Sequence, residues 1–464
     1  MDAEMDSIGE NSTWELAHLP AGHKAIGLKW VYRVKRDPDG NIVKYKARLV
    51  AKGYVQREGV DFEEVFAPVA WMETVRLLLA LAAHSGWEVH HMDVKSAFLN
   101  GELAEEVYVA RPPGYVTVGK EQRVLRLRKV LYGLRQAPRA WYVKLDETMS
   151  MLGFTRSPLE HAVYRRGDAH SFFLVGVYVD DLIITGTSKT SIGEFKNQMQ
   201  ELFKMSDLGL LSYYLGIKTP MECRLKLRKN DDAKAVDPSL YRSIIGSLRY
   251  LVHSRPDMTH AVGLMSRYME RPIVTHWTAV KQILRYVRST LSYGCCYGRG
   301  SGKSELLGYS DSDHAGDVED CKSTSGQIFF LDSNPITWAS QKQKIVAISS
   351  CEAEYVAAAS ATCQGLWVNR LLAEMKGEKA SAFMLLIDNK SAIALAKNPV
   401  HHDRSKHIDV KFHFIRDCVE HGEVQLDHVG SEDQVVDALT KALGRVKFIK
   451  QRQRLGVKEI GKGR

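Results

Sequence analysis

The sequence predicts an α+β first part and an α/β second part, joined by a short linker. Around Asp39-Gly40, residues 25–55 form two alternating apolar and basic runs, which is typical of a β-hairpin because Asp-Gly fits its tight turn. Beyond residue 304 the pattern runs through three strands and a helix and then alternates, which favours a mixed sheet with helices. The Gly- and Ser-rich stretch 298–304 separates the two patterns and is the best linker candidate.

Composition and charge favour a multi-domain protein that binds nucleic acid. The chain has 464 residues, roughly three times a typical domain of about 150 residues. With 45% hydrophobic and 26% charged residues it can bury sizeable cores, which excludes a disordered tail. Its 64 Lys and Arg residues exceed its 55 Asp and Glu residues and give a net charge of +9. This excess favours a polyanionic partner, nucleic acid first and an acidic membrane surface second.

Cysteine usage and hydropathy indicate a reducing compartment and no membrane span. The seven cysteines include no C-x2-C pair, which argues against a disulfide framework and a structural zinc site. The N-terminal segment is acidic and lacks an apolar core, so we expect no secretory signal there. No stretch approaches about 18 uninterrupted apolar residues. We therefore expect a soluble intracellular protein.

Strand and helix patterns alternate along the first part. Residues 72–84 have helical spacing, residues 87–99 have an extended pattern, and Pro138 opens a second helix. Residues 171–185 form two short apolar runs, which is typical of a hairpin. Further helical patterns cover residues 194–204, 239–253, 257–269 and 275–290.

Three carboxylates stand where the first part predicts buried strands. Asp93 ends an apolar strand, and Asp180 and Asp181 lie inside the hairpin of residues 171–185. Carboxylates placed there are costly to bury unless they are paired or bind metal. Gathered together, they would suit two Mg²⁺ ions that activate a primer 3′-hydroxyl and stabilise the leaving pyrophosphate. An Asp-Asp pair is more often a turn or a helix cap, and the apolar flanks weaken that alternative without removing it.

Five blocks of the first part resemble copia-type reverse transcriptases. Residues 178–181, Tyr-Val-Asp-Asp, resemble the YxDD motif of these polymerases. The companion blocks follow in the family's order, at residues 46–70, 92–109, 131–142 and 205–216. The resemblance implies an α+β right-hand polymerase with fingers, palm and a truncated thumb.

The same resemblance implies the metal ligands of a polymerase site. Asp93 takes the place of the first metal-binding aspartate, and the backbone of Val94 lies near the second ion. Asp180 and Asp181 take the places of the paired aspartates. Two Mg²⁺ ions per active site are expected, with Mn²⁺ as the alternative ion.

Four further residues are candidates for nucleotide contacts. Phe98 falls where the family keeps an aromatic ring beneath the incoming sugar, a ring that would collide with a ribose 2′-hydroxyl; the alternative is an ordinary core Phe. Gln136 lies in the block that resembles the template- and nucleotide-contacting segment. Lys46 and Arg48 are candidates for gripping the triphosphate, because basic side chains suit phosphate oxygens. Basic residues on exposed hairpins are, however, commonly just solvated.

Four acidic residues stand out in the second part. Asp311 and Asp388 follow apolar strands, Glu354 lies in a helix, and Asp437 opens the last helix. Such a cluster can hold two Mg²⁺ ions that activate water against a phosphodiester. For any one of these residues taken alone, a helix cap or a surface charge is the commoner explanation.

Seven blocks between residues 305 and 443 resemble the copia-type ribonuclease H domain, which implies an α/β ribonuclease H-like fold. The resemblance places Asp311, Glu354, Asp388 and Asp437 at the four metal-binding positions. Two nearby glutamates could take the second of these positions. Glu354 is preferred to Glu352 because Ala-Glu-Tyr-x-Ala fits the family's pattern.

His428 is the candidate for a proton-shuttling histidine of this second site. It stands nine residues before Asp437. An ordinary histidine at a strand end is at least as common, so both interpretations stay open.

One segment of the family is missing from this chain. After residues 213–217 the sequence lacks the stretch that is expected to start the thumb. Because a thumb closes over primer and template, we expect this polymerase to dissociate quickly and to have poor processivity.

The patterns and resemblances together divide the chain into six segments. These are an acidic tail (1–13), fingers and palm (14–218), truncated thumb and connection helices (219–297), a linker (298–304), a ribonuclease H-like domain (305–443) and a basic tail (444–464).

The predicted function is RNA-directed DNA polymerisation coupled to ribonuclease H cleavage. The expected partners are an RNA template, a DNA primer, dNTPs and an RNA–DNA hybrid, with no membrane. A nuclease with a crippled polymerase half, and a silent remnant that only binds nucleic acid, are the alternatives. Since no gag-like zinc knuckle, protease or integrase motif is present, we expect a carboxyl-terminal fragment that associates with other Pol and Gag products. The resemblance implies work in cytoplasmic virus-like particles, with nuclear entry of the DNA.

Overall fold

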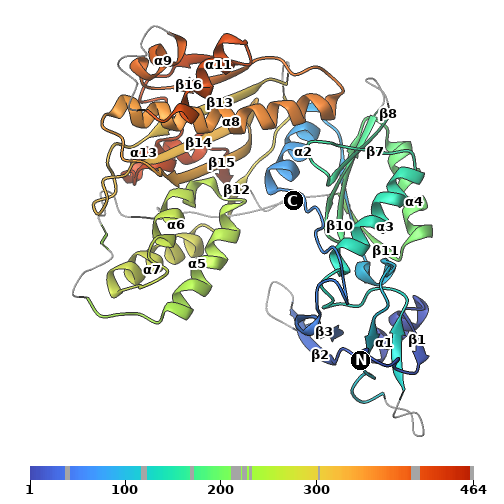
Figure 1. Ribbon diagram of the computed structural model, residues 1–464. Coiled ribbons are helices and arrows are strands. Elements are labelled where there is room, and N and C mark those ends of the chain that lie inside the picture. Colours follow the sequence, from blue (N-terminus) through green and yellow to red (C-terminus); the bar gives the residue numbers. More distant parts are fainter. Residues whose placement is uncertain are drawn as a thin grey trace. The chain divides into compact units, whose positions relative to one another are not determined.

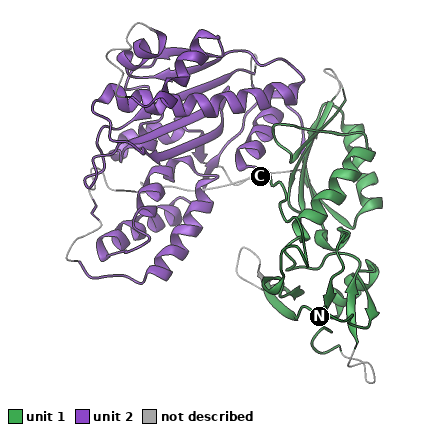
Figure 2. Ribbon diagram, in the orientation of Figure 1, with its two compact units in different colours: residues 1–70, 90–210 green, residues 71–89, 211–464 purple. Residues whose placement is uncertain are grey.

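The structure is a computed structural model of the chain. It describes residues 1–36, 42–115, 123–167, 172–210, 221, 227–228, 233–300, 304–398 and 408–459. The chain divides into two compact units, one of residues 1–70 and 90–210 and one of residues 71–89 and 211–464 (Figure 2). Among the described residues, no helix is both long and apolar enough to cross a lipid bilayer.

A six-stranded sheet forms the centre of the first unit, with its strands in the order β11, β4, β10, β9, β8, β7 (Figure 1). The bounds of these strands are β4 Val89–Val94, β7 Thr155–Arg156, β8 Val163–Gly167, β9 Phe172–Tyr178, β10 Asp181–Gly186 and β11 Met205–Leu210. Helices α3 (Ala137–Met151) and α4 (Lys189–Leu202) pack on this sheet through one buried apolar cluster. The helix predicted to open at Pro138 and the hairpin predicted in residues 171–185 are both confirmed.

Smaller β-structure completes the first unit. A three-stranded sheet contains β1 (Trp14–Ala17), β6 (Val124–Leu127) and β5 (Tyr108–Val109). The hairpin predicted in residues 25–55 is confirmed by the antiparallel pair β2 (Leu28–Arg36) and β3 (Ile42–Ala51), although its Asp39-Gly40 turn lies outside the described residues. Two short 3₁₀ helices are η1 (Gly53–Val55) and η2 (Ala97–Asn100).

The first residues form helix α1 (Asp2–Glu10), where the sequence analysis expects a tail over residues 1–13. Ile8 is buried in a cluster that includes Leu49 of β3. The Leu49 amide also donates a hydrogen bond to the Glu4 carboxylate at 3.4 Å. One well-placed apolar side chain therefore docks a segment whose composition is mainly acidic.

The second unit begins with helices. These are α2 Met72–Ser85, α5 Pro238–Val252, η3 Pro256–Met258, α6 Thr259–Ser266 and α7 Val274–Ser289. Although α2 lies between polymerase-like blocks in the sequence, it packs within the second unit. The Arg76 guanidinium donates to the carbonyl oxygen of Ile336 at 2.5 Å and stacks 4.0 Å from the centre of the Trp338 ring. Residues 71–89 therefore depart from the expected grouping of residues 14–218.

A five-stranded mixed sheet forms the centre of the second unit, as predicted beyond residue 304. Its order is β15, β14, β13, β16, β17, with the first three strands antiparallel and β13, β16 and β17 parallel. The strands are β13 Leu306–Ser312, β14 Thr324–Leu331, β15 Asn334–Lys342, β16 Phe383–Ile387 and β17 Val424–His428. The helices are α8 Ser350–Lys376, α9 Lys390–Lys397, η5 Val410–His413, α11 Phe414–Glu420 and α12 Asp437–Thr440.

Residues 444–459 form a helix and a strand, where the sequence analysis expects a basic tail over residues 444–464; residues 460–464 lie outside the described residues. Helix α13 (Arg445–Arg454) buries Phe448, and β18 (Val457–Glu459) pairs antiparallel with β12 (Tyr293–Cys295). The many basic residues of this segment conceal its apolar anchors, which is why composition alone suggested a tail.

Helix α8 lies unusually close to the sheet at Gly365. A Cβ atom at this position would come within 2.4 Å of the Phe383 ring and 2.8 Å of the Phe329 ring. Real Cβ atoms essentially never approach side chains so closely, so only glycine permits this crossing. Because Phe329 lies on β14 and Phe383 on β16, the crossing fixes how α8 lies on these two strands.

We predict that Gly365→Ala lowers the stability of the second unit by about 1–3 kcal/mol, because overpacking forces ring or backbone shifts. Gly246→Ala in α5 is the matched control, since nothing lies within 4 Å of a Cβ there. That control should raise stability by about 0.5–1 kcal/mol through helix propensity. Urea unfolding followed by circular dichroism measures both changes, and equal shifts in the two variants would contradict the close crossing.

Candidate active sites

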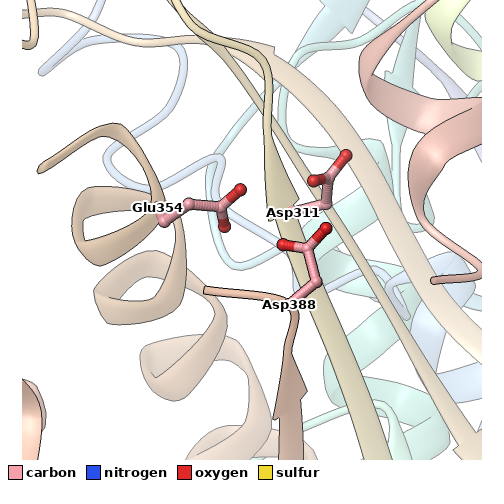
Figure 3. A group of neighbouring side chains, drawn as sticks. All are labelled: Asp311, Glu354 and Asp388. Atoms are coloured by element: carbon pink, nitrogen blue, oxygen red, sulfur yellow. The ribbon is translucent and has the colours of Figure 1, made fainter. Parts of the chain in front are cut away.

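Three carboxylates of the second unit point toward one another (Figure 3). Asp311 is the second-last residue of β13, Glu354 lies on α8 and Asp388 follows β16. Each offers a carboxylate oxygen, and these oxygens all lie within 4.8 Å of one another. Asp311 and Glu354 are buried and Asp388 is half-buried. The structure thus brings together three of the four residues that the sequence predicts for the ribonuclease H site.

The sheet register explains why the two aspartates meet. In the parallel pair of β13 and β16, Ser310 lies opposite Ile387. The residues that follow them, Asp311 and Asp388, therefore leave the sheet at the same edge. Parallel strands deliver side chains from their carboxyl ends to a common edge, which is where sites in such sheets gather.

Helix α8 supplies the third carboxylate one turn after its start. Ser349 caps the helix by accepting the Glu352 amide hydrogen bond at 3.1 Å, and the Glu352 carboxylate accepts from the Ile348 amide at 2.8 Å. This reciprocal capping satisfies the helix start and occupies Glu352. Glu354 instead turns to the cluster and accepts from the Ser312 amide at 3.2 Å. The geometry therefore agrees with the preference for Glu354 over Glu352.

Asp437 lies beside this group and is joined to it through lysine. It is the first residue of α12 and its side chain is 3% exposed. Lys441 Nζ lies 2.6 Å from one Asp437 oxygen and 3.8 Å from Asp311, while Lys447 Nζ lies 2.6 Å from the other Asp437 oxygen. Thr440 adds a hydroxyl hydrogen bond to Asp311.

Burial and mutual repulsion dominate the electrostatics of the cluster. Burial raises the pKa of Glu354 well above its usual range, and the nearby carboxylates of Asp311 and Asp388 raise it further. Burial likewise raises the pKa of Asp311 and that of Asp388, while the Lys441 ammonium works against both shifts. Oε2 of Glu354 is buried with no hydrogen-bond partner among the described residues.

This donor set fits a hard divalent cation. Every donor is a carboxylate oxygen, which Mg²⁺ prefers, and no thiolate or imidazole completes the group among the described residues. Buried carboxylates that repel one another are the groups that gain most from such a cation. Asp311, Glu354 and Asp388 would hold it, with Asp437 within reach.

His428 does not contact the carboxylates in the part of the chain that the structure describes. It is the last residue of β17, is exposed, and lies opposite Ile387 in the register with β16. Its strand position therefore neighbours that of Asp388. Its proton-shuttling role stays a prediction.

The polymerase candidates gather around the turn between β9 and β10. Asp180 and Asp181 stand at this turn, and Asp93 lies on β4, the neighbour of β10. The Val94 amide donates a hydrogen bond to the Asp180 carbonyl oxygen at 2.9 Å. Sheet pairing thus brings residues more than eighty positions apart in sequence to one edge.

The turn itself is strained and braced. Val179 has a φ of +61°, in the left-handed region that a β-branched residue rarely adopts. The Trp141 indole donates to the Val179 carbonyl oxygen at 2.7 Å and holds the turn against α3. Strain of this kind persists only where surrounding contacts enforce it, and it is commonest at functional sites.

The three polymerase carboxylates interact without converging as tightly as the first group. Burial raises the pKa of Asp180, and Asp181 and Asp93 raise it further. Asp181 is also engaged by His91, whose Nε2 lies 2.7 Å from Oδ1. Within the described residues, only Asp311, Glu354 and Asp388 bring three carboxylate oxygens within 4.8 Å of one another.

Arg48 and Phe98, the residues predicted to contact phosphate and sugar, both pack against Tyr132. The sequence analysis did not predict a role for Tyr132. The Arg48 guanidinium carbon lies 4.0 Å from the centre of the Tyr132 ring, and the Phe98 ring lies 5.2 Å from it. Phe98 is half-buried and packs against both apolar clusters of the unit. Tyr132 belongs to the LYGLRQAPRAWY block, so its position could have been found there, whereas its stacking could not.

Gln136 and Lys46 have different surroundings. Gln136 is 3% exposed, donates to the Asp61 carbonyl oxygen at 2.9 Å and accepts from the Gln56 amide at 3.0 Å. Both ends of its amide thus tie the unit together internally. Lys46 is half-buried on β3, and its charge, like that of Arg48, acts on the buried Glu4 carboxyl.

Comparisons with known proteins give the family. The family model described as reverse transcriptase (RNA-dependent DNA polymerase) matches residues 11–233. The Pol polyprotein of transposon TNT 1-94 from Nicotiana tabacum is 38% identical over 97% of this chain. The putative transposon Ty5-1 protein YCL074W of Saccharomyces cerevisiae is 30% identical over 58% of this chain and 98% of its own length. The chain belongs to the copia-type reverse transcriptase family.

The predicted relationship to copia-type Pol polyproteins is thereby confirmed. The chain spans 37% of the tobacco polyprotein. Their alignment covers 491 residues, more than the 464 of this chain, so the relative has residues without a counterpart here. The solved N-terminal RNase H domain of Rv2228c from Mycobacterium tuberculosis, a fusion with maltose-binding protein, matches 32% of this chain and 98% of that chain, with 14% identity and a TM-score of 0.21.

We predict that Glu354→Gln stabilises the metal-free reverse transcriptase chain at pH 8 by about 1–3 kcal/mol. The raised pKa of Glu354 means that the folded state keeps a proton that the unfolded state has already lost. The contribution of Glu354 to stability is therefore fully present below its unfolded pKa of about 4.3, and it is lost as the pH rises toward the raised pKa of the folded state.

Thermal melts in EDTA between pH 5 and 8 measure this effect. The variant should lose less stability than the parent across that range. Glu352→Gln is the matched control, because that carboxylate caps α8 and its loss should bring no gain. A parent and a Glu354→Gln variant with identical pH profiles would show that Glu354 is not held neutral.

Proposed function

We propose that this chain extends a DNA primer on an RNA template with dNTPs and cuts the RNA strand of RNA–DNA hybrids. One observation carries the proposal: a member of the reverse transcriptase family has, in its second unit, two buried carboxylates and one half-buried carboxylate that converge at one sheet edge. The strained turn that presents Asp180 and Asp181 beside Asp93 supports the polymerase half.

In the polymerase half, Asp93, Asp180 and Asp181 would hold two Mg²⁺ ions, with the Val94 backbone near one of them. The ions supply Lewis acidity for the attacking hydroxyl and the leaving pyrophosphate. Arg48 offers its guanidinium to phosphate oxygens from a fixed position on the Tyr132 ring.

The remaining candidates of the polymerase half would set nucleotide choice and affinity. Phe98, whose ring packs at a tilt against the Tyr132 ring, would exclude a 2′-hydroxyl by shape. Lys46 adds positive charge near the phosphates. Gln136 would support the template-side segment from within the unit.

In the nuclease half, Asp311, Glu354, Asp388 and Asp437 would hold two Mg²⁺ ions, or Mn²⁺ as the alternative. Such ions, when bound, would supply Lewis acidity toward the attacking water and the leaving oxygen of the cut strand. His428, exposed at the end of β17, would carry a proton away from the site.

The first unit corresponds in this proposal to the fingers and palm of a right-hand polymerase. Helices α5 to α7 would supply the shortened thumb and connection. Residues 213–217, after which the family segment is missing, lie outside the described residues. The loss of that segment should make the enzyme distributive. We further propose that the chain acts with other Pol and Gag products in virus-like particles.

We predict that Asp181→Asn abolishes primer extension and leaves RNA cleavage, whereas Asp388→Asn does the reverse. Each change should lower its own activity by about two orders of magnitude or more, because it removes a metal-site charge. The assay uses the full chain, a labelled RNA–DNA hybrid, dNTPs and Mg²⁺.

The outcomes of this assay separate the functions. Cleavage without extension would leave a nuclease on a dead polymerase. Neither activity in a protein that circular dichroism shows to be folded would reduce the chain to a nucleic-acid-binding remnant.

We predict that Phe98→Ala raises the use of ribonucleotides relative to deoxyribonucleotides by about 10- to 100-fold, because the ring that meets the 2′-hydroxyl is gone. Phe98→Tyr keeps the ring and should retain the parent's discrimination. Single-nucleotide insertion kinetics with dCTP and CTP measure the ratio. An unchanged ratio in a Phe98→Ala variant that still extends primers would assign Phe98 to the core alone.

A further inference from the structure

Lys441 is a lysine inside the carboxylate cluster of the second unit. It is the C-cap residue that follows α12, four residues after Asp437. Its ammonium lies 2.6 Å from the Asp437 carboxylate and 3.8 Å from the Asp311 carboxylate, both of which are almost fully buried. Its own side chain is 45% exposed. It therefore links the buried carboxylates to the surface of the molecule.

The position of Lys441 answers an electrostatic need. Removing carboxylates from water without a counter-charge is strongly unfavourable. Lys441 is the largest opposing charge acting on Asp311 and on Asp388, and it contacts Asp437 directly. Lys447 contacts Asp437 alone among the four carboxylates. Lys441 is thus the lysine that acts on three of the four carboxylates, Asp311, Asp388 and Asp437.

The charge count changes when divalent cations enter. Four carboxylates face two lysine ammonium groups, so two negative charges remain uncompensated if all four are ionised. Two divalent cations would more than neutralise them and leave the site with an excess of two positive charges. An excess at a half-exposed rim suits a phosphodiester, which carries negative charge on oxygens that ammonium groups bind well.

We propose that Lys441 is a resident cation of the nuclease site. It compensates Asp437 and Asp311 while divalent cations are absent and competes with those cations for the same carboxylates. When the cations bind, its ammonium is released toward the exposed rim and binds a phosphate of the RNA strand. This inference rests on the proposed nuclease function and adds to it a residue that the carboxylate motif does not contain.

The proposal separates metal affinity from catalysis in an unusual way. A lysine that merely supports the fold would, when removed, weaken both. A resident competitor would, when removed, strengthen cation binding and still slow cleavage, because the phosphate loses its partner. The Lys441→Met variant therefore distinguishes the two roles by the sign of one change.

The test titrates Mn²⁺ into the full chain carrying Asp181→Asn, with free Mn²⁺ followed by electron paramagnetic resonance. The same chain with Asp388→Asn added measures the Mn²⁺ binding outside the cluster, and this background is subtracted. Lys441→Met should bind Mn²⁺ about tenfold more tightly than its parent, and at saturating Mn²⁺ its kcat/KM for an RNA–DNA hybrid should be about tenfold lower. Thermal melts establish that each variant is folded.

Two further variants complete the design. Lys441→Arg keeps the charge and grips carboxylates with two N–H donors, so it should fold and bind Mn²⁺ several-fold more weakly than the parent. Lys450→Met removes an exposed charge of α13 and should leave Mn²⁺ affinity unchanged.

Two results overturn the proposal, in distinguishable ways. If the parent binds Mn²⁺ and cuts RNA, an unchanged or weaker Mn²⁺ affinity in folded Lys441→Met overturns the proposed role of Lys441 and leaves the proposed nuclease function standing. Should that variant fail to fold, unchanged or tighter affinity in Lys441→Arg has the same meaning. A folded parent that neither binds Mn²⁺ at the cluster nor cuts RNA removes the proposed nuclease function, and this inference with it.

Discussion

The repulsion between carboxylates buried at the edge of a sheet is the constraint on which much of this molecule depends. In the second unit, Asp311, Glu354 and Asp388 are brought within a few ångströms by strand register and by a helix that only a glycine allows so close. Packing enforces this proximity at an electrostatic cost. The core that supports the site is therefore also what keeps its groups ready for a cation.

In the first unit, Asp93, Asp180 and Asp181 also repel one another, but their oxygens do not converge as closely as those of the second unit. Its turn at Val179 is strained, and Trp141 braces it from α3. Asp181 has a histidine partner, because Nε2 of His91 lies 2.7 Å from its Oδ1. The two sites thus differ in how far the protein alone compensates their charge: His91 partners one carboxylate in the first, and lysines surround Asp437 in the second.

Much of this arrangement was predictable, because it rests on short-range patterns. Apolar runs around Asp180 predicted a hairpin, Pro138 predicted a helix start, and the order of strands and helices after residue 304 predicted a mixed sheet. The meeting of Asp311 with Asp388 followed from the rule that parallel strands end at a common edge. Local chemistry sufficed for each of these.

The remainder depends on contacts between segments distant in sequence, which patterns do not record. Ile8 docks a helix that looks like an acidic tail, and Phe448 anchors a segment that looks like a basic one. The contacts of Tyr132 with Arg48 and with Phe98 form only in three dimensions. The grouping of α2 with the second unit is of the same kind.

The measurement that tests the account most directly is the change in melting temperature on adding Mg²⁺ to the full chain, compared with its Asp388→Asn variant. If the buried carboxylates form a cation site, Mg²⁺ stabilises the parent, by about 2.7 kcal/mol at one hundred times the dissociation constant. The variant should gain much less because one ligand is lost. Equal shifts in both proteins would mean that the ion acts elsewhere and that the cluster is not a metal site.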